Sequence, residues 1–212
     1  AGCPAMKILI VDNNMMRDSW GASELVGHAR QLTGATVWVR RGPHSDLPSS
    51  PEGFDRVILS GSLTRAMDLA PWVIELDRFV RRAVDLSIPL LGVCYGHQTL
   101  HRALGGLETV RQSQVPEYGW TQIRKTGPSR LLLGLSPLFY SYSSHQDEVA
   151  SPLKELEVTA CSDDCAIQAV EMKSKPVFGI QFHPEKVFKT AELYDETVGQ
   201  AIFSNFLRET SR

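Results

Sequence analysis

The segment around Cys94 combines a buried strand, a tight turn and a helix in an arrangement that suits a nucleophile. An apolar run at residues 89–93 leads into Gly92-x-Cys94-x-Gly96, and apolar residues at helical spacing follow. This pattern is the cysteine counterpart of the Gly-x-Ser-x-Gly elbow, in which a strained strand-to-helix turn exposes the nucleophile. The positive end of the helix favours the thiolate, and the N–H of Tyr95 can donate to an oxyanion. Cys94 alone is also compatible with a small buried hydrophobic residue.

A histidine and a carboxylate follow the last predicted core strand, in the segment Phe182-His183-Pro184-Glu185. A cysteine nucleophile needs a base that takes its proton, and the base needs an acceptor on its other ring nitrogen. Because Pro184 makes the turn short and rigid, we expect Cys94, His183 and Glu185 to form a catalytic triad. Taken alone, His-Pro-Glu is also typical of a polar turn at the end of a strand.

Alternating strands and helices are expected to position these two motifs. The alternation predicts an α/β fold with a mostly parallel central sheet and helices on both faces. After residue 106, short alternating stretches predict a small antiparallel sheet appended to this core. The expected core strands are 8–11, 36–39, 57–59, 89–93 and 177–182, the appended strands 121–124, 158–160 and 166–171, and the helices 19–32, 72–86, 96–104 and 191–208.

Length and composition bound the class of protein. The 212 residues, of which 42% are hydrophobic and 22% charged, fit one globular domain. We expect this domain at residues 6–212 and interpret residues 1–5 as an expression scar or ragged start. A net charge of −2 gives no electrostatic reason to expect nucleic acid or a membrane surface as a partner. The cysteines form no disulfide framework, which favours a cytoplasmic protein; they are Cys3, Cys94, Cys161 and Cys165.

The elbow Gly92-Val93-Cys94-Tyr95-Gly96-His97-Gln98 and the Phe182-to-Glu185 segment together resemble the class I glutamine amidotransferase family. The resemblance covers residues 7–206 and implies a flavodoxin-like α/β fold. The elbow and the pattern Ser144-His145-x-Asp147-x-Val149 are most similar to the amidotransferase domain of GMP synthetase and its stand-alone relatives.

This resemblance implies a reaction and a role for each site residue. Cys94 would attack the side-chain amide of L-glutamine, His183 would act as base and then as acid, and Glu185 would orient His183. Water would then hydrolyse the glutamyl thioester. Gly61 and Tyr95 would form the oxyanion hole. Gln98 would hold the glutamine head group, although a solvated helix residue fits that position equally well. The backbone of residues 144–147 would also hold it: Ser144, His145, Gln146 and Asp147.

Two departures from the family pattern leave alternatives open. Gly61 is followed by Ser62-Leu63-Thr64, where the family usually has further glycine and proline residues. This altered loop motivates a second hypothesis, a γ-glutamyl peptidase on the same fold; a non-catalytic binding module is a third. The chain also has no phosphate-binding Gly-x-x-x-x-Gly-Lys-Ser/Thr loop. We therefore expect a separate synthetase as the partner that accepts ammonia.

No cofactor or metal is expected. Cys161-x-x-x-Cys165 resembles a metal-binding motif. The sequence has no second cysteine pair and no nearby histidine at ligand spacing to complete it.

Overall fold

A computed structural model describes residues 5–16 and 22–209, and a single mixed sheet runs through this part of the chain. Its strand order is β2-β1-β3-β4-β9-β8-β7-β5-β6. The strands from β2 to β9 are parallel, and each later neighbour is antiparallel. The strands are β1 (Lys7–Asp12), β2 (Thr36–Arg41), β3 (Arg56–Leu59), β4 (Leu90–Val93), β5 (Val110–Lys125), β6 (Leu138–Val149), β7 (Leu156–Cys161), β8 (Ala169–Met172) and β9 (Val177–Ile180).

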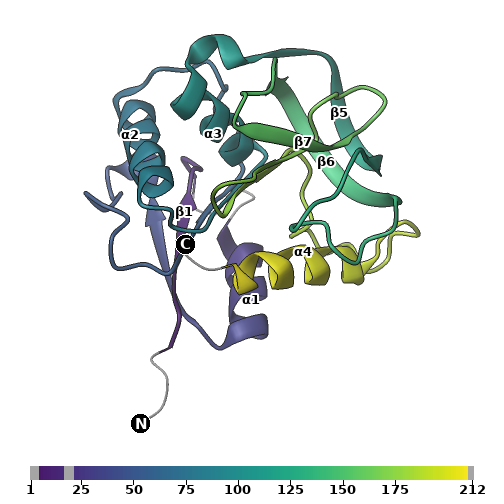
Figure 1. Ribbon diagram of the computed structural model, residues 1–212, viewed down its shortest axis with the longest axis horizontal. Helices are drawn as coiled ribbons and strands as arrows, with labels where there is room; N and C mark the ends of the chain where they lie inside the picture. The colour runs from purple at the N-terminus through teal and green to yellow at the C-terminus, as the bar shows by residue number, and fades with distance from the viewer. Residues whose placement is uncertain (1–4, 17–21, 210–212) are drawn as a thin grey trace.

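Helices cover both faces of the parallel part of the sheet (Figure 1). Alternate side chains of β1 point to opposite faces, as in any strand. Ile8 and Ile10 pack with side chains of α1 and α4, whereas Leu9 and Val11 pack with side chains of α2 and α3. The predicted fold class is therefore confirmed. The helices are α1 (Ala22–Thr33), α2 (Pro71–Asp85), α3 (Tyr95–Gly105) and α4 (Glu196–Arg208), with 3-10 turns at Gly42–His44 and Leu107–Thr109.

The antiparallel region is larger than predicted. As predicted, its strands are appended to the core sheet, and they join it through β8, which pairs with β9. The strand β5 is 16 residues long, with a register shift between Gln112 and Glu117. The sequence did not predict β6 at all, because its inward-facing side chains include buried Ser141, Ser143 and His145, which hide the hydrophobic alternation.

The ends of some predicted elements also differ. The closing helix begins at Glu196 instead of residue 191. Asp195 caps this start, since its carboxylate accepts a hydrogen bond of 2.9 Å from the N–H of Thr197. The predicted start of the first helix, residues 19–21, lies outside the described residues, as does Cys3. Within residues 5–16 and 22–209, no helix is both long and apolar enough to cross a membrane.

The carboxyl ends of β1, β3, β4 and β9 meet at one edge of the sheet. In open parallel sheets this edge is where ligands bind. The chain that leaves these strands carries Asn13, Gly61, Cys94 and His183.

Candidate active site

Cys94 lies on the turn between β4 and α3, in a strained backbone conformation. Its backbone angles are φ 52° and ψ −105°, a region that favours glycine. The flanking glycines are required by space. A Cβ on Gly92 would lie 2.4 Å from the carbonyl oxygen of Gly96, and a Cβ on Gly96 would lie 2.5 Å from that of Leu59. The N–H of Cys94 donates to the carbonyl of Ile180 at 2.7 Å, which fixes the elbow to β9.

The side chains of Cys94, His183 and Glu185 make a continuous line of contacts. His183 Nδ1 and Glu185 Oε1 are 2.7 Å apart, and the His183 ring also hydrogen-bonds to Cys94. Burial alone would lower the pKa of His183, but the charges of Glu185 and Cys94 outweigh it and raise that pKa to about 10. At neutral pH the imidazole therefore holds its proton. The N–H of His183 donates to the carbonyl of Tyr142 at 2.7 Å, so β6 fixes the backbone of this residue.

Gly61 lies beside His183, since a Cβ on Gly61 would be 2.9 Å from His183 Cε1. Two asparagines that the sequence analysis missed hold the peptides on either side of Gly61. Asn13 Nδ2 donates to the carbonyl of Ser60 at 2.8 Å, and Asn14 Nδ2 donates to the carbonyl of Gly61 at 3.2 Å. Because a trans peptide points its N–H opposite to its carbonyl, Asn13 sets the direction of the Gly61 N–H. Their position directly after β1, at the ligand-binding edge, was the signal that could have identified them.

Tyr95, the other predicted oxyanion donor, is the first residue of α3. The first N–H groups of a helix have no intrahelical acceptor, so this backbone donor is available at the positive end of the helix. Its side chain is fully buried, in the cluster of side chains between α2, α3 and the sheet.

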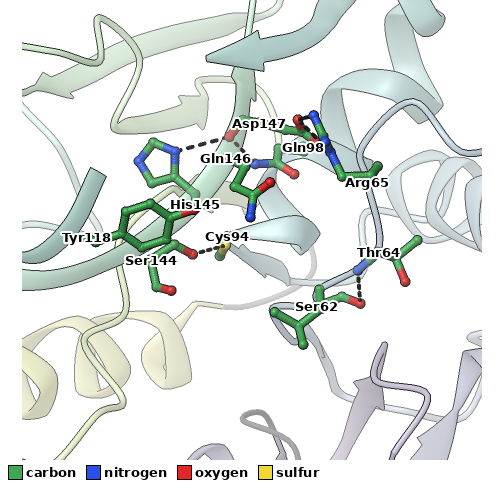
Figure 2. A pocket seen from close by; sticks show the side chains of 11 residues that line it. Ser62, Thr64, Arg65, Cys94, Gln98, Tyr118, Ser144, His145, Gln146 and Asp147 are labelled. Atoms are coloured by element: carbon green, nitrogen blue, oxygen red, sulfur yellow. Dashed lines mark hydrogen bonds and ion pairs between the residues drawn. The ribbon is translucent and has the colours of Figure 1, made fainter. Parts of the chain in front are cut away.

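A small pocket opens next to Cys94 (Figure 2). Its volume is about 60 Å³, and it is partly open to solvent. It brings together Cys94, Gln98 and all four predicted residues of β6 with the loop that follows Gly61. The lining residues are Ser62, Leu63, Thr64, Arg65, Cys94, Gln98, Tyr118, Ser144, His145, Gln146 and Asp147.

Gln98 is buried in this pocket, so the interpretation as a solvated helix residue is wrong. Its amide nitrogen donates to the backbone carbonyl of Asp147 at 2.6 Å and to Gln181 Oε1 at 3.1 Å. Both of these partners are acceptors, which fixes the orientation of the Gln98 amide. The oxygen of that amide is therefore the end that can meet a ligand.

The four predicted residues of β6 differ in what they offer. The carbonyl of Ser144 lies 3.7 Å from Cys94 Sγ, and the Gln146 side chain is exposed beside the pocket. The carbonyl of Asp147 already accepts hydrogen bonds from Gln98 and from the ring of His145. The carboxylate of Asp147 is bound to Arg65, a residue of the altered loop that the sequence analysis did not single out.

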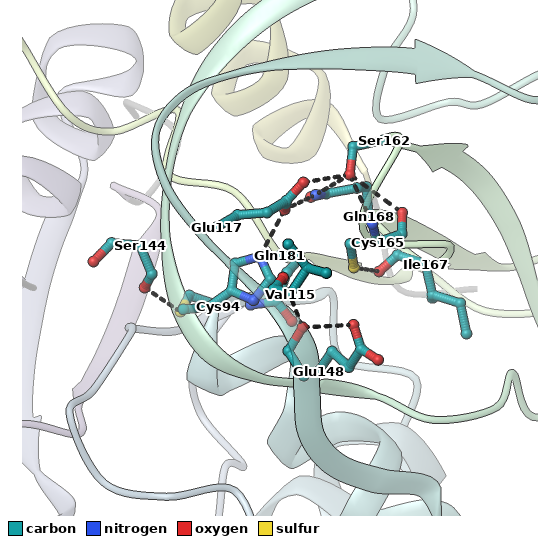
Figure 3. A network of polar contacts seen from close by, with 12 residues as sticks. Cys94, Val115, Glu117, Ser144, Glu148, Ser162, Cys165, Ile167, Gln168 and Gln181 are labelled. Atoms are coloured by element: carbon teal, nitrogen blue, oxygen red, sulfur yellow. Dashed lines mark hydrogen bonds and ion pairs between the residues drawn. The ribbon is translucent and has the colours of Figure 1, made fainter.

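His145 belongs to a buried polar network centred on Glu117. Figure 3 shows Glu117 with its partners Ser162 and Gln168. Glu117 Oε2 lies 2.8 Å from His145 Nε2 and accepts from Gln168 Nε2 at 2.5 Å, and Glu117 Oε1 accepts from Ser162 Oγ at 2.5 Å. No local pattern in the sequence marks Glu117, because its partners come from other parts of the chain.

Ligand atoms of Glu117, His145 and Cys165 all lie within 4.8 Å of one another, which is a spacing that metal sites also show. Cys161, the sequence neighbour that suggested a metal motif with Cys165, is not in this group. Burial raises the pKa of the Cys165 thiol to about 12, and its Sγ lies 3.7 Å from the backbone carbonyl of Ile167. The carboxylate oxygens of Glu117 are also occupied by hydrogen bonds, and the group is best described as a hydrogen-bonded network.

Known proteins resemble this chain over most of its length. The sequence model of the family described as glutamine amidotransferase class-I matches residues 21–203. A glutamine-hydrolyzing GMP synthase subunit from Sulfolobus acidocaldarius is 37% identical over 158 residues, which cover 73% of this chain and 76% of that protein. The subunit of the same name from Saccharolobus solfataricus is 40% identical over 154 residues, with the same coverage.

A solved structure supports the same fold. A glutamine amido transferase from Methylobacillus flagellatus superposes with a TM-score of 0.80 at 20% identity, covering 98% of this chain and 96% of the other. At that identity the likeness concerns the fold alone. The match to the family over most of its length shows that this chain belongs to the class I glutamine amidotransferases.

Proposed function

We propose that this chain hydrolyses L-glutamine to glutamate and ammonia through a glutamyl thioester on Cys94. The observation that carries the proposal is the buried line of contacts from Cys94 through His183 to Glu185, with a His183 pKa raised to about 10. A protonated imidazole beside the sulfur stabilises the thiolate, which is the nucleophilic form of cysteine.

The proposed reaction uses each of these groups in turn. The Cys94 sulfur attacks the side-chain amide carbon, and the N–H groups of Gly61 and Tyr95 stabilise the oxyanion. When the C–N bond breaks, the proton of His183 goes to the leaving nitrogen, which departs as ammonia. His183 is now neutral and takes a proton from water, whose oxygen attacks the thioester and releases glutamate. Glu185 keeps the ring oriented and stabilises its charged form.

We propose further that a separate synthetase uses the ammonia. The relatives from Sulfolobus acidocaldarius and Saccharolobus solfataricus are named as subunits of a GMP synthase. Ammonia released into neutral water is protonated and loses its nucleophilic lone pair, so direct transfer to a docked partner makes chemical sense. A GMP synthase-like partner is accordingly the acceptor that we propose.

The test is glutamate release by the wild-type chain, by Cys94→Ala and by the matched control Cys161→Ala. We expect Cys94→Ala to reduce turnover by about 10⁴-fold or more and Cys161→Ala to retain it. Full activity of Cys94→Ala would refute the mechanism. Faster turnover of γ-glutamyl dipeptides than of glutamine would favour the peptidase instead. Addition of the synthetase from the same organism should increase glutamate release and couple it to amination.

A further inference from the structure

We propose that Arg65 binds the α-carboxylate of glutamine, so that the pocket accepts the free amino acid and disfavours a glutamine whose carboxylate is blocked. The inference rests on the proposed function and concerns the same pocket. It assigns a substrate contact to the loop that departs from the family pattern.

The charges of the pocket carry this inference. Among the described residues that line it, Arg65 is the only arginine or lysine, and Asp147 is the only carboxylate. Glutamine is a zwitterion, so its head group brings one negative and one positive charge to the same place. Isolated charges are costly to bury, and the carboxylate of glutamine therefore needs a cationic partner as it enters. Arg65 is the candidate that the pocket offers.

The structure holds Arg65 in place and leaves part of its guanidinium free. Nε donates to both carboxylate oxygens of Asp147, at 3.0 and 2.9 Å, and Nη2 donates to Oδ1 at 2.5 Å. Within the described residues, Nη1 has no hydrogen-bond acceptor, and the side chain keeps 39% of its surface exposed. A guanidinium carries five N–H groups in a planar fork that matches a carboxylate. Its free end can therefore bind a second carboxylate.

The backbone beside Arg65 is fixed as well, so the guanidinium is preorganised. The N–H of Ala66 donates to Asp147 Oδ2 at 2.7 Å, and the carbonyl of Ala66 accepts from Arg102 Nη1 at 2.8 Å. Arg102 is in turn paired with buried Asp77 at 2.8 Å. A side chain that is already ordered loses less conformational entropy when it binds a ligand.

Gln98 supplies the complementary group. Its amide oxygen is the end left for a ligand, and an oxygen can accept a hydrogen bond from the α-ammonium of glutamine. Arg65 and Gln98 both line the pocket next to Cys94 (Figure 2). Together, Arg65 and Gln98 would bind the two charged groups of the head group while the side-chain amide of glutamine reaches the sulfur of Cys94.

The experiment compares two substrates on matched variants, with ammonia release as the readout. L-Glutamine is compared with L-glutamine α-amide, which lacks the negative charge. We expect Arg65→Gln to raise KM for glutamine by roughly 10- to 100-fold, the range for a hydrogen bond to a charged group. KM for the α-amide should change little. Arg65→Lys keeps the positive charge but lacks the planar guanidinium. Its KM for glutamine should lie between those of wild type and Arg65→Gln.

The control is Arg111→Gln. Arg111 pairs with buried Glu148 at 2.7 Å and is 52% exposed, so it makes a similar ion pair outside the pocket. This variant should leave both KM values unchanged. If Arg65 only anchors the loop, Arg65→Gln will raise KM equally for glutamine and for the α-amide. That result would overturn the proposal.

A binding measurement separates this proposal from the proposed function. Calorimetry measures the affinity of both compounds for two proteins, the Cys94→Ala variant and the double variant that also carries Arg65→Gln. A preference for glutamine that disappears with Arg65→Gln supports the contact, even if wild-type turnover of glutamine is absent. Equal binding of the two compounds to Cys94→Ala would overturn the proposal, even if glutamine hydrolysis is confirmed.

Discussion

Among residues 5–16 and 22–209, two buried pairs of a histidine and a glutamate have nearly the same distance between ring nitrogen and carboxylate oxygen. His183 and Glu185 are 2.7 Å apart, and His145 and Glu117 are 2.8 Å apart. The two pairs differ in what surrounds them. On its other side, His183 meets the sulfur of Cys94, whereas the second nitrogen of His145 lies 3.1 Å from the backbone carbonyl of Asp147. Each nitrogen of His145 thus has a fixed oxygen acceptor.

The two carboxylates differ in the same sense. Glu117 accepts hydrogen bonds from Ser162, Gln168 and His145. The Oε2 atom of Glu185 is buried and has no hydrogen-bond partner among the described residues. A fully bonded pair stabilises one arrangement of the fold, and an incompletely bonded pair next to a sulfur is free to move a proton. The surroundings of such a pair, more than its own geometry, therefore distinguish a structural pair from a reactive one.

The largest expected difference between the pairs is in turnover. We expect His183→Ala to lower kcat for glutamine by about 10⁴-fold or more, because it removes the acid and base of the reaction. His145→Ala should lower kcat far less and should reduce the free energy of unfolding by about 3 kcal/mol, since it leaves the Glu117 charge buried without its partner. Steady-state kinetics and urea denaturation of both variants measure the two effects. Equal losses of kcat would contradict the distinction.

The carboxylates sharpen the comparison further. We expect Glu185→Gln to reduce kcat by about 10² to 10⁴-fold, because the amide stabilises imidazolium less well, with a modest change in unfolding free energy. Glu117→Gln should change kcat little and lower the free energy of unfolding by about 3 kcal/mol, because three donors share that carboxylate. The same two measurements apply, and a stable, inactive Glu117→Gln enzyme would show that Glu117 acts in the chemistry.

A third expected effect is a pH dependence of stability that His183 introduces. Because the folded-state pKa of His183 is raised from 6.5 to about 10, its protonated form contributes stability that is fully present below pH 6.5. This contribution is lost as the pH rises from 6.5 through about 10. The free energy of unfolding of wild type should therefore exceed that of His183→Ala by more at pH 6.5 than at pH 10. A constant difference between the two proteins would show that folding does not raise the pKa of His183.

The parts of the site that the sequence predicted are those that one local segment encodes. The elbow at Cys94 and the contact between His183 and Glu185 each lie within a few residues, so residue type and spacing were enough to predict these local conformations. The core strands were predicted for a similar reason, since a run such as Ile8-Leu9-Ile10 is buried on both faces and is continuously apolar.

The parts that the sequence did not predict depend on partners far along the chain. Arg65 and Asp147 are 82 residues apart, and Asn13 and Ser60 are 47 apart. Glu117 finds its partners in β6 and in the chain after β7. The strand β6 was missed for a related reason: the polar side chains that would build the pocket and the network replace the apolar ones that mark a strand.

The most direct test of the central claim is to trap the covalent intermediate. The wild-type chain is mixed with glutamine, quenched in acid within one turnover, and digested for mass spectrometry. We expect a glutamyl adduct on the peptide that contains Cys94, and no adduct on the peptide that contains Cys161 and Cys165. In Glu185→Gln the adduct should form more slowly, and in Glu117→Gln it should form at nearly the wild-type rate. Glutamate release with no adduct on Cys94, or an adduct on another cysteine, would contradict the account.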